Sequence, residues 1–215
     1  HSSIAIKRIQ VFLGGWSQRV IEYPWVLKQI KGMVKGALVL DVGCSESLLS
    51  HELLYSGLKV SGIDIYDHYY KPSNLSFIKR NIMDTQLADN SFDAIYIVST
   101  IEHIDINNDG KLTIDDRGDF VTMNELHRIC KPTGLVILTT PYIGGANFVI
   151  DYNERNYNRN RLDSIISNYE IVKEDYFYPL QKENKTAWIK VNRSEIDKMK
   201  FDIPGLACLI LKPIK

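Results

Sequence analysis

Apolar runs alternate with amphipathic segments along most of the chain, and this alternation predicts its secondary structure. Five short apolar runs have the length and composition of strands, namely residues 37–42, 59–65, 75–80, 92–98 and 135–140. Apolar positions recur with a helical period in four other segments, namely residues 17–35 (restarting at Pro24), 45–56, 118–130 and 159–168. Strands that alternate with helices at this spacing indicate βαβ units and a parallel sheet covered on both faces.

The C-terminal part of the chain departs from this pattern. Two further β-rich stretches, 169–178 and 205–211, follow the last predicted helix, and a polar segment with Trp188 lies between them. Because no crossover helix joins these two stretches, we expect them to add antiparallel strands to the parallel sheet. A length of 215 residues without internal repeats predicts a single domain.

Composition narrows the class of partner. The 26 basic residues balance the 26 acidic ones, so the sequence gives no support for a nucleic-acid partner, which usually requires a basic face. No apolar run approaches the roughly 20 residues of a membrane-spanning helix. Cys44, Cys130 and Cys208 are far apart and lie in or beside apolar stretches, which predicts reduced, buried thiols in a cytoplasmic protein. The oligomeric state has no signature in the sequence.

The first strand ends in a loop that could bind a ligand. In a doubly wound sheet, ligands bind outside the carboxyl ends of the strands, where the strand order reverses. Gly43 permits a tight turn there, and the next predicted helix begins near Ser45, so that its unpaired N–H groups face the same crevice. The candidate cofactor-binding residues of this loop are Asp41, Gly43, Cys44 and Ser45.

Acidic residues follow the next two strands. Asp64 comes about 20 residues after the loop, where a carboxylate can accept hydrogen bonds from both hydroxyls of a ribose. Ile65, beside it, is a further cofactor candidate. Asp84 follows the third strand and could accept a hydrogen bond from an adenine amino group. The alternatives are a solvated turn carboxylate for Asp64 and a helix N-cap for Asp84.

Five segments of the chain, taken in their order along the sequence, resemble motifs of the class I S-adenosylmethionine-dependent methyltransferases. The segments that carry the resemblance are VLDVGCSES (39–47), GIDI (62–65), NIMD (81–84), LADNSFDAIYIVSTIEHI (87–104) and ELHRICKPTGLVILTTPY (125–142). The resemblance implies a Rossmann-like, doubly wound, seven-stranded α/β sheet, mostly parallel, with an antiparallel strand near the C-terminus and helices on both faces. It also implies the cofactor S-adenosylmethionine, with S-adenosylhomocysteine as product, and a domain over residues 37–215 whose site is capped by a helical segment, 1–36.

A narrower resemblance points to the type 11 methyltransferases associated with glycan biosynthesis. It rests on EYPWVL (22–27), STIEHI (99–104) and the Tyr-rich C-terminal part. The main departure from the wider family is in the loop, where Ser45 and Ser47 replace two of the usual glycines. The glycines of such a loop let the backbone approach the pyrophosphate of NAD closely. A cofactor without a pyrophosphate does not require the backbone to come so close at these positions. The substitutions therefore count more against a dinucleotide than against S-adenosylmethionine.

The segment after the fourth strand holds the candidate catalytic residues. Methyl transfer needs an in-line approach in a site that excludes water, and a hydroxyl acceptor also benefits from a general base. Histidine is the residue type suited to act as such a base near neutral pH, which makes His103 the candidate, with Glu102 as its neighbour, although either side chain could instead serve a structural role. Ser99 is a cofactor candidate in the same segment. The candidate substrate residues are Tyr23, Trp25 and Tyr142, the first two on the N-terminal helix.

Residues 105–116 (DINNDGKLTIDD) have the spacing of a 12-residue calcium loop, with Asp116 in place of the final Glu. A calcium loop of this type needs a helix on each side, whereas this segment lies inside a βαβ connection. We therefore favour a solvated loop or substrate lid over bound calcium, and we expect no metal among the site residues.

The sequence favours an O-methyltransferase that acts on a small molecule or a saccharide. Three alternatives stay open at this point. An NAD-dependent oxidoreductase would need a loop that follows the pyrophosphate closely, which residues 43–47 do not provide. A non-catalytic module with a methyltransferase-like fold is compatible with the missing glycines. An RNA or protein methyltransferase would require a local basic groove beside the fourth strand.

Overall fold

A computed structural model describes residues 18–106, 117–145, 149–151, 154–182, 185–199 and 203–215. The main sheet has eight strands within these residues, in the order β3-β2-β1-β4-β5-β10-β8-β9. Its strands are β1 (Leu38–Val42), β2 (Lys59–Asp64), β3 (Ser76–Lys79), β4 (Phe92–Val98), β5 (Cys130–Tyr142), β8 (Tyr169–Lys182), β9 (Lys185–Val191) and β10 (Gly205–Pro213). The first five in this order pair in parallel, whereas β10 pairs antiparallel with β5 and β8, and β8 with β9.

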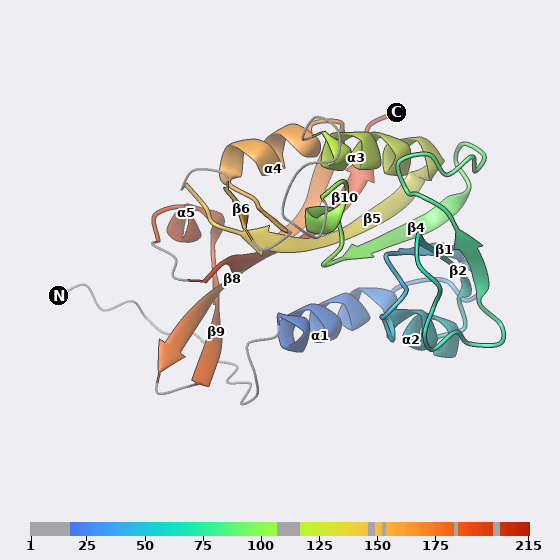
Figure 1. Cartoon of the computed structure of the whole chain (residues 1–215), viewed down its shortest axis with the longest axis horizontal. Coiled ribbons are helices and arrows are strands. Elements are labelled where there is room, and N and C mark those ends of the chain that lie inside the picture. The colour runs from blue at the N-terminus through green and yellow to red at the C-terminus, as the bar shows by residue number, and fades with distance from the viewer. Residues whose placement is uncertain (1–17, 107–116, 146–148, 152–153, 183–184, 200–202) are drawn as a thin grey trace.

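Helices cover both faces of the sheet, as the sequence predicts. Figure 1 shows α1 and α2 on one face and α3 and α4 on the other. The helices are α1 (Arg19–Ile30), α2 (Leu49–Tyr55), α3 (Gly118–Ile129), α4 (Arg159–Ile165) and α5 (Arg193–Ile196), with a 3₁₀ turn, η1, at Ile101–His103. The fold class is therefore confirmed as a mostly parallel, doubly wound sheet with an antiparallel C-terminal part.

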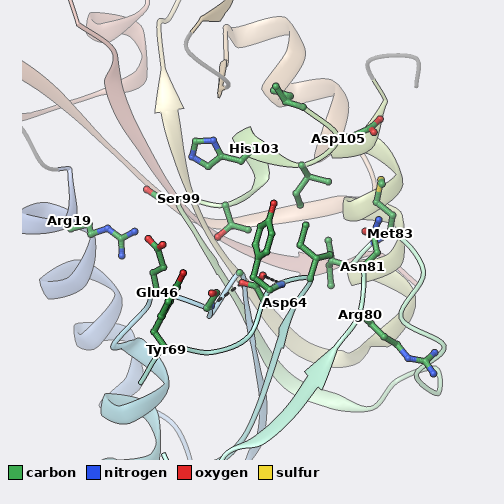
Figure 2. Close-up of a pocket in the computed structure, with 18 residues that line it drawn as sticks. Arg19, Glu46, Asp64, Tyr69, Arg80, Asn81, Met83, Ser99, His103 and Asp105 are labelled. Atoms are coloured by element: carbon green, nitrogen blue, oxygen red, sulfur yellow. Dashed lines mark hydrogen bonds between the residues drawn. The ribbon is translucent and has the colours of Figure 1, made fainter. Parts of the chain in front are cut away.

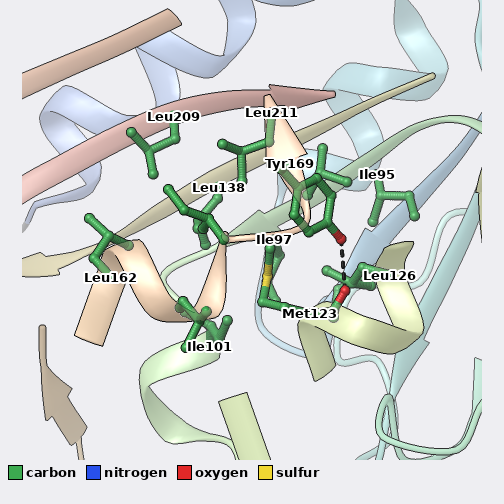
Figure 3. Close-up of a cluster of buried hydrophobic side chains, with 14 of the residues drawn as sticks. Ile95, Ile97, Ile101, Met123, Leu126, Leu138, Leu162, Tyr169, Leu209 and Leu211 are labelled. Atoms are coloured by element: carbon green, nitrogen blue, oxygen red, sulfur yellow. Dashed lines mark hydrogen bonds between the residues drawn. The ribbon is translucent and has the colours of Figure 1, made fainter. Parts of the chain in front are cut away.

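Each face of the sheet has its own hydrophobic core. β4 is buried on both sides, so Ile95 and Ile97 pack toward α3 and α4, while Ala94 and Tyr96 pack toward α1 and α2. Figure 3 shows the first of these cores, in which the Tyr169 hydroxyl donates a hydrogen bond of 2.7 Å to the Met123 carbonyl oxygen. This burial on two faces explains why the parallel strands are recognisable as continuous apolar runs.

The strand count differs from the predicted seven. The segment around Trp188, expected to be a polar connection, forms β9 at the edge of the sheet. Edge strands commonly carry charged side chains, especially lysine, and Lys185 and Lys190 give this segment the polar character of a connection. A separate two-stranded sheet, β6 (Val149–Asp151) with β7 (Glu154–Asn156), was also not predicted, because three-residue strands carry almost no periodicity.

Two helix boundaries were also predicted differently. α1 is continuous from Arg19 to Ile30 and does not restart at Pro24. Pro24 lies on the exposed side of the helix, where the lost N–H costs one backbone hydrogen bond. α2 begins at Leu49 and not at residue 45, because residues 45–48 form a loop. Among the described residues, no helix is long and apolar enough to cross a membrane.

An ionisable side chain is buried between β1 and α2. Asp41 is 2% exposed, and its Oδ2 accepts a hydrogen bond of 2.6 Å from the Ser50 hydroxyl. Burial raises the pKa of the Asp41 carboxyl from 3.8 to about 7. A carboxyl whose pKa is higher in the folded state favours folding below its unfolded pKa, and this contribution is lost as the pH rises through about 7.

We therefore predict that Asp41→Asn makes the protein less sensitive to alkaline pH. Relative to the wild type, the variant should gain about 2 kcal/mol of stability between pH 5.5 and pH 8.5, because the wild-type Asp41 carboxyl loses its proton over this range, with a folded pKa of about 7. Urea unfolding at the two pH values measures this gain. Asp67→Asn is the matched control, because Asp67 is 82% exposed and paired with Lys79. Equal pH dependence in the wild type and Asp41→Asn would contradict the prediction.

Candidate active site

A cavity lies where the strand order reverses, between β1 and β4. It has a volume of about 690 Å³ and is lined by the segments that follow β1, β2, β3 and β4, with one side chain from α1. Figure 2 shows Ser99 and His103 on one side of it and Asn81 and Met83 on the other. Ligands of open α/β sheets bind at this position. The first strand's loop and the fourth strand's end are therefore brought together as the sequence predicts.

Gly43 has to be a glycine in this loop. Its φ is +73°, a region that other residues rarely adopt, and its N–H donates a hydrogen bond of 2.9 Å to the Ile63 carbonyl oxygen. A Cβ at this position would lie 2.4 Å from both Cγ2 and Oγ1 of Thr100. Thr100 itself is held by a hydrogen bond of 2.9 Å from its hydroxyl to the Val98 carbonyl oxygen.

The two serines do not need glycine's conformational freedom. Neither Ser45 nor Ser47 has a positive φ, so a side chain introduces no backbone strain at either position. The Ser45 hydroxyl donates a hydrogen bond of 2.8 Å to the Asp67 carbonyl oxygen, and the Ser47 hydroxyl accepts one of 3.0 Å from the Leu49 N–H at the start of α2. The serines therefore stabilise the loop, with Ser45 lining the cavity.

Asp64 lines the cavity at the end of β2. Its Oδ2 accepts a hydrogen bond of 2.9 Å from the Ser45 N–H, and its Oδ1 accepts one of 2.9 Å from the Tyr66 N–H. Each carboxylate oxygen can accept a second hydrogen bond, so this arrangement leaves acceptor sites for a diol. Ile65, 53% exposed, presents an apolar side chain to the same cavity.

Two other candidates of the loop and strand region lie behind the cavity wall. Asp41 is buried against Ser50, and Cys44 is fully buried, so neither lines the cavity. Burial also raises the pKa of the Cys44 thiol, as expected for an inert packed cysteine. The structure leaves Cys44, Cys130 and Cys208 as buried thiols.

The sequence predicts that Asp84 faces the cavity after β3, but other residues of this segment do so. Asn81, Ile82 and Met83 line it, whereas Asp84 is exposed and does not. The Asn81 Oδ1 accepts a hydrogen bond of 2.9 Å from the Met83 N–H, which closes a tight turn. An asparagine directly after a strand is the sequence signal that could have pointed to this turn.

The segment after β4 divides its side chains between the cavity and the core. Ser99, at a positive φ of 44°, and His103 line the cavity. Glu102 points the other way and is 1% exposed, and burial raises the pKa of its carboxyl well above the usual range. Among the described side chains, its Oε2 has no hydrogen-bond partner.

α1 contacts the site through one turn. Arg19 lines the cavity and donates a hydrogen bond of 3.1 Å to the Tyr23 hydroxyl, which lies 3.1 Å from the hydroxyl of Ser47. The Glu22 Oε1 accepts a hydrogen bond of 2.6 Å from the Ser99 hydroxyl. Sequence reasoning missed Glu22, although a charged residue among the apolar positions of a helix is a signal that could have identified it.

The remaining substrate candidates lie in the interior. Trp25 is buried and donates a hydrogen bond of 2.7 Å to Asp175, and Tyr142 is buried and donates one of 2.6 Å to Asp197. Neither side chain lines the cavity. The segment 105–116, whose spacing resembles a calcium loop, lies outside the described residues apart from Asp105 and Ile106. The described residues contain no cluster that could hold a metal ion.

Parts of the chain are similar to known methyltransferases. Residues 40–138 match the family model described as "Methyltransferase domain". A curated relative, the O-methyltransferase rstn1 of Aspergillus nomiae, is 31% identical over 84 aligned positions. That match covers 34% of this chain and spans 37% of the relative's length. The match of residues 40–138 agrees with the wider resemblance to methyltransferases seen in the sequence, and it does not test the narrower one to the glycan-associated group.

Solved structures of low identity share the fold. One is the 1,6-didemethyltoxoflavin-N1-methyltransferase of Burkholderia thailandensis with bound 1,6-didemethyltoxoflavin and S-adenosylhomocysteine, at a TM-score of 0.61 and 14% identity over 92% of this chain and 80% of that chain. Another is the [4+2]-cyclase SpnF, at a TM-score of 0.64 and 14% identity over 94% of this chain and 84% of that chain. At this identity the likeness shows the fold alone.

We predict that Gly43→Ala lowers the free energy of unfolding by more than the backbone strain of a positive φ alone would cost. A positive φ in a residue other than glycine costs about 1–2 kcal/mol, and displacing Thr100 adds to that cost. Gly57→Ala is the matched control, because Gly57 has a φ of +83° but its nearest neighbour would lie 3.6 Å from the added Cβ. Urea unfolding of both variants measures the difference, and equal losses of stability would contradict the close contact with Thr100.

Proposed function

We propose that the chain is an S-adenosylmethionine-dependent methyltransferase that methylates an oxygen of a small molecule or a saccharide. The observation that carries the proposal is the pairing of Gly43 with Asp64. Position 43 accepts only glycine and lines the cavity. The Asp64 carboxylate lines the same cavity, and its oxygens can accept further hydrogen bonds. The family match over residues 40–138 supports this assignment.

The cavity residues fit the cofactor in three parts. The open backbone at Gly43 and Ser45 would lie along its amino acid portion, and Asp64 would accept hydrogen bonds from the ribose hydroxyls. Ile65 on one side and Asn81 to Met83 on the other would enclose the adenine. This assigns the adenine side to the turn that begins at Asn81 in place of Asp84.

The residues after β4 would serve both the cofactor and the methyl acceptor. When bound, S-adenosylmethionine supplies a methyl group attached to a positively charged sulfur. Ser99 would contact the cofactor, and His103, in the same segment, would accept the proton that an acceptor hydroxyl loses. Tyr69, 73% exposed on the rim of the cavity, offers an aromatic face for a ring-shaped acceptor such as a sugar.

An oxygen acceptor is favoured by the curated relative, which is described as an O-methyltransferase. The N-methyltransferase among the structural neighbours shares the fold at lower identity. α1 would act as the cap that the sequence predicts for the N-terminal segment, because Arg19 and Tyr23 contact the cavity wall and the loop. The cytoplasmic location and the link to glycan biosynthesis stay predictions from the sequence.

The alternative of a non-catalytic module rested on the two missing glycines. Ser45 and Ser47 adopt backbone conformations open to any residue, and their hydroxyls are used within the loop. The loop therefore gives no reason to expect lost cofactor binding. NAD, which would require a closer approach for its pyrophosphate, is a suitable negative control.

Binding of S-adenosylhomocysteine tests the cofactor assignment. We expect Asp64→Ala to weaken the affinity by about 10- to 100-fold, because a hydrogen bond to a charged group contributes about 1.5–3 kcal/mol. Asp67→Ala is the matched control, since this exposed carboxylate lies in the same connection but outside the cavity. Calorimetry measures both variants, and a wild-type protein that binds neither this ligand nor S-adenosylmethionine would refute the proposed function.

His103 tests the acceptor side. With an acceptor found by screening hydroxyl compounds and saccharides, His103→Ala should lower kcat by about 100-fold or more, the usual contribution of a general base. Affinity for S-adenosylhomocysteine should change little, because the imidazole serves the acceptor. His51→Ala controls for loss of a histidine outside the cavity. Transfer of a radiolabelled methyl group measures the rate, and an unchanged kcat in His103→Ala would remove His103 from the mechanism.

A further inference from the structure

Glu22 is a fully buried acidic residue on a helix that otherwise packs through apolar side chains. It is 0% exposed, among neighbours of α1 such as Trp25 and Val26 that form the core on this face of the sheet. Among the described residues its Oε2 has no hydrogen-bond partner. Burying a carboxyl group in this way is costly unless its hydrogen bonds compensate, so its presence calls for an explanation.

The Glu22 Oε1 joins the ends of two central strands. It accepts a hydrogen bond of 2.6 Å from the Ser99 hydroxyl, after β4, and another of 2.6 Å from the Thr139 hydroxyl, in β5. Thr139 Oγ1 in turn accepts a hydrogen bond of 3.1 Å from the Ser99 N–H. Glu22, Ser99 and Thr139 thus form a closed triangle of hydrogen bonds at the wall of the cavity.

This triangle coincides with a strained point of the backbone. Ser99 has a φ of 44°, which costs a serine free energy and persists only where surrounding contacts impose it. The residues that follow, Thr100 and His103, line the cavity, so the conformation of Ser99 sets the direction of the segment that carries them. Docking of α1 does not itself need Glu22, because apolar packing and the Trp25–Asp175 hydrogen bond already hold the helix.

We propose that Glu22 is a positioning residue that holds Ser99, and through it the cavity wall from Ser99 to His103, in the conformation that binds the cofactor. The inference rests on the proposed function for the identity of the ligand. It assigns to the N-terminal helix a role beyond covering the site, because one of its side chains shapes the cavity wall from behind.

The test compares three variants by calorimetry with S-adenosylhomocysteine. Glu22→Ala, which leaves the Ser99 and Thr139 hydroxyls without their acceptor, should weaken binding at least 10-fold. Glu22→Gln, which keeps an Oε1 acceptor, should restore affinity to within about 3-fold of the wild type. Val26→Ala, the matched control on the same helix, should lower the melting temperature without changing the affinity, since Val26 is fully buried in the core.

A double-mutant cycle separates positioning from general loosening of the helix. If Glu22 acts through Ser99, Glu22→Ala and Ser99→Ala should have far less than additive effects on affinity. Additive effects, wild-type affinity in Glu22→Ala, or an equal loss in Val26→Ala would overturn the inference.

Amide hydrogen exchange provides a readout that does not need the ligand. The amides of residues 99–103 should exchange at least 10-fold faster in Glu22→Ala than in the wild type, and at the wild-type rate in Val26→Ala. If the wild type binds no S-adenosylhomocysteine, the proposed function fails, and unchanged exchange in Glu22→Ala would then refute the positioning role separately.

Discussion

The site depends on the close approach of Gly43 to Thr100, where the carboxyl ends of β1 and β4 meet at the reversal of strand order. No Cβ fits between them, because Thr100 is held by its own hydrogen bond to the backbone of β4. This contact sets how far the first loop can move from the fourth strand. The carboxylate of Asp64 and the segment from Ser99 onward take their places on either side of it.

Buried carboxyl groups surround this contact, and each has a different consequence. Asp41 joins β1 to α2 through Ser50, Glu22 joins α1 to Ser99, and Glu102 is buried in the same 3₁₀ turn that carries His103. Burial raises the pKa of all three, so their contribution to stability falls as the pH rises. Such groups are retained at a cost in stability, as is common where a site needs a defined geometry.

The fold alone does not decide the reaction. Its structural neighbours include a methyltransferase and a [4+2]-cyclase at nearly equal similarity. What distinguishes such proteins is the set of side chains at the carboxyl ends of the strands. In this chain those side chains combine a close-approach glycine, a carboxylate with remaining acceptor sites and a histidine across the cavity from Asn81 and Met83.

The sequence by itself determined the doubly wound sheet, the helices on both faces and several residues that directly follow strands and line the cavity, namely Gly43, Asp64, Ser99 and His103. These follow from local periodicity and from the rule that parallel strands end at one edge. Only the tertiary structure decided the eighth strand, the inward direction of Trp25 and Tyr142, which residues of the turn at Asn81 face the cavity, and the contact between Glu22 and Ser99. Trp25, Glu22 and Tyr142 form hydrogen bonds with partners 150, 77 and 55 positions away in the chain, and the eighth strand depends on edge pairing. Local periodicity carries no information about either.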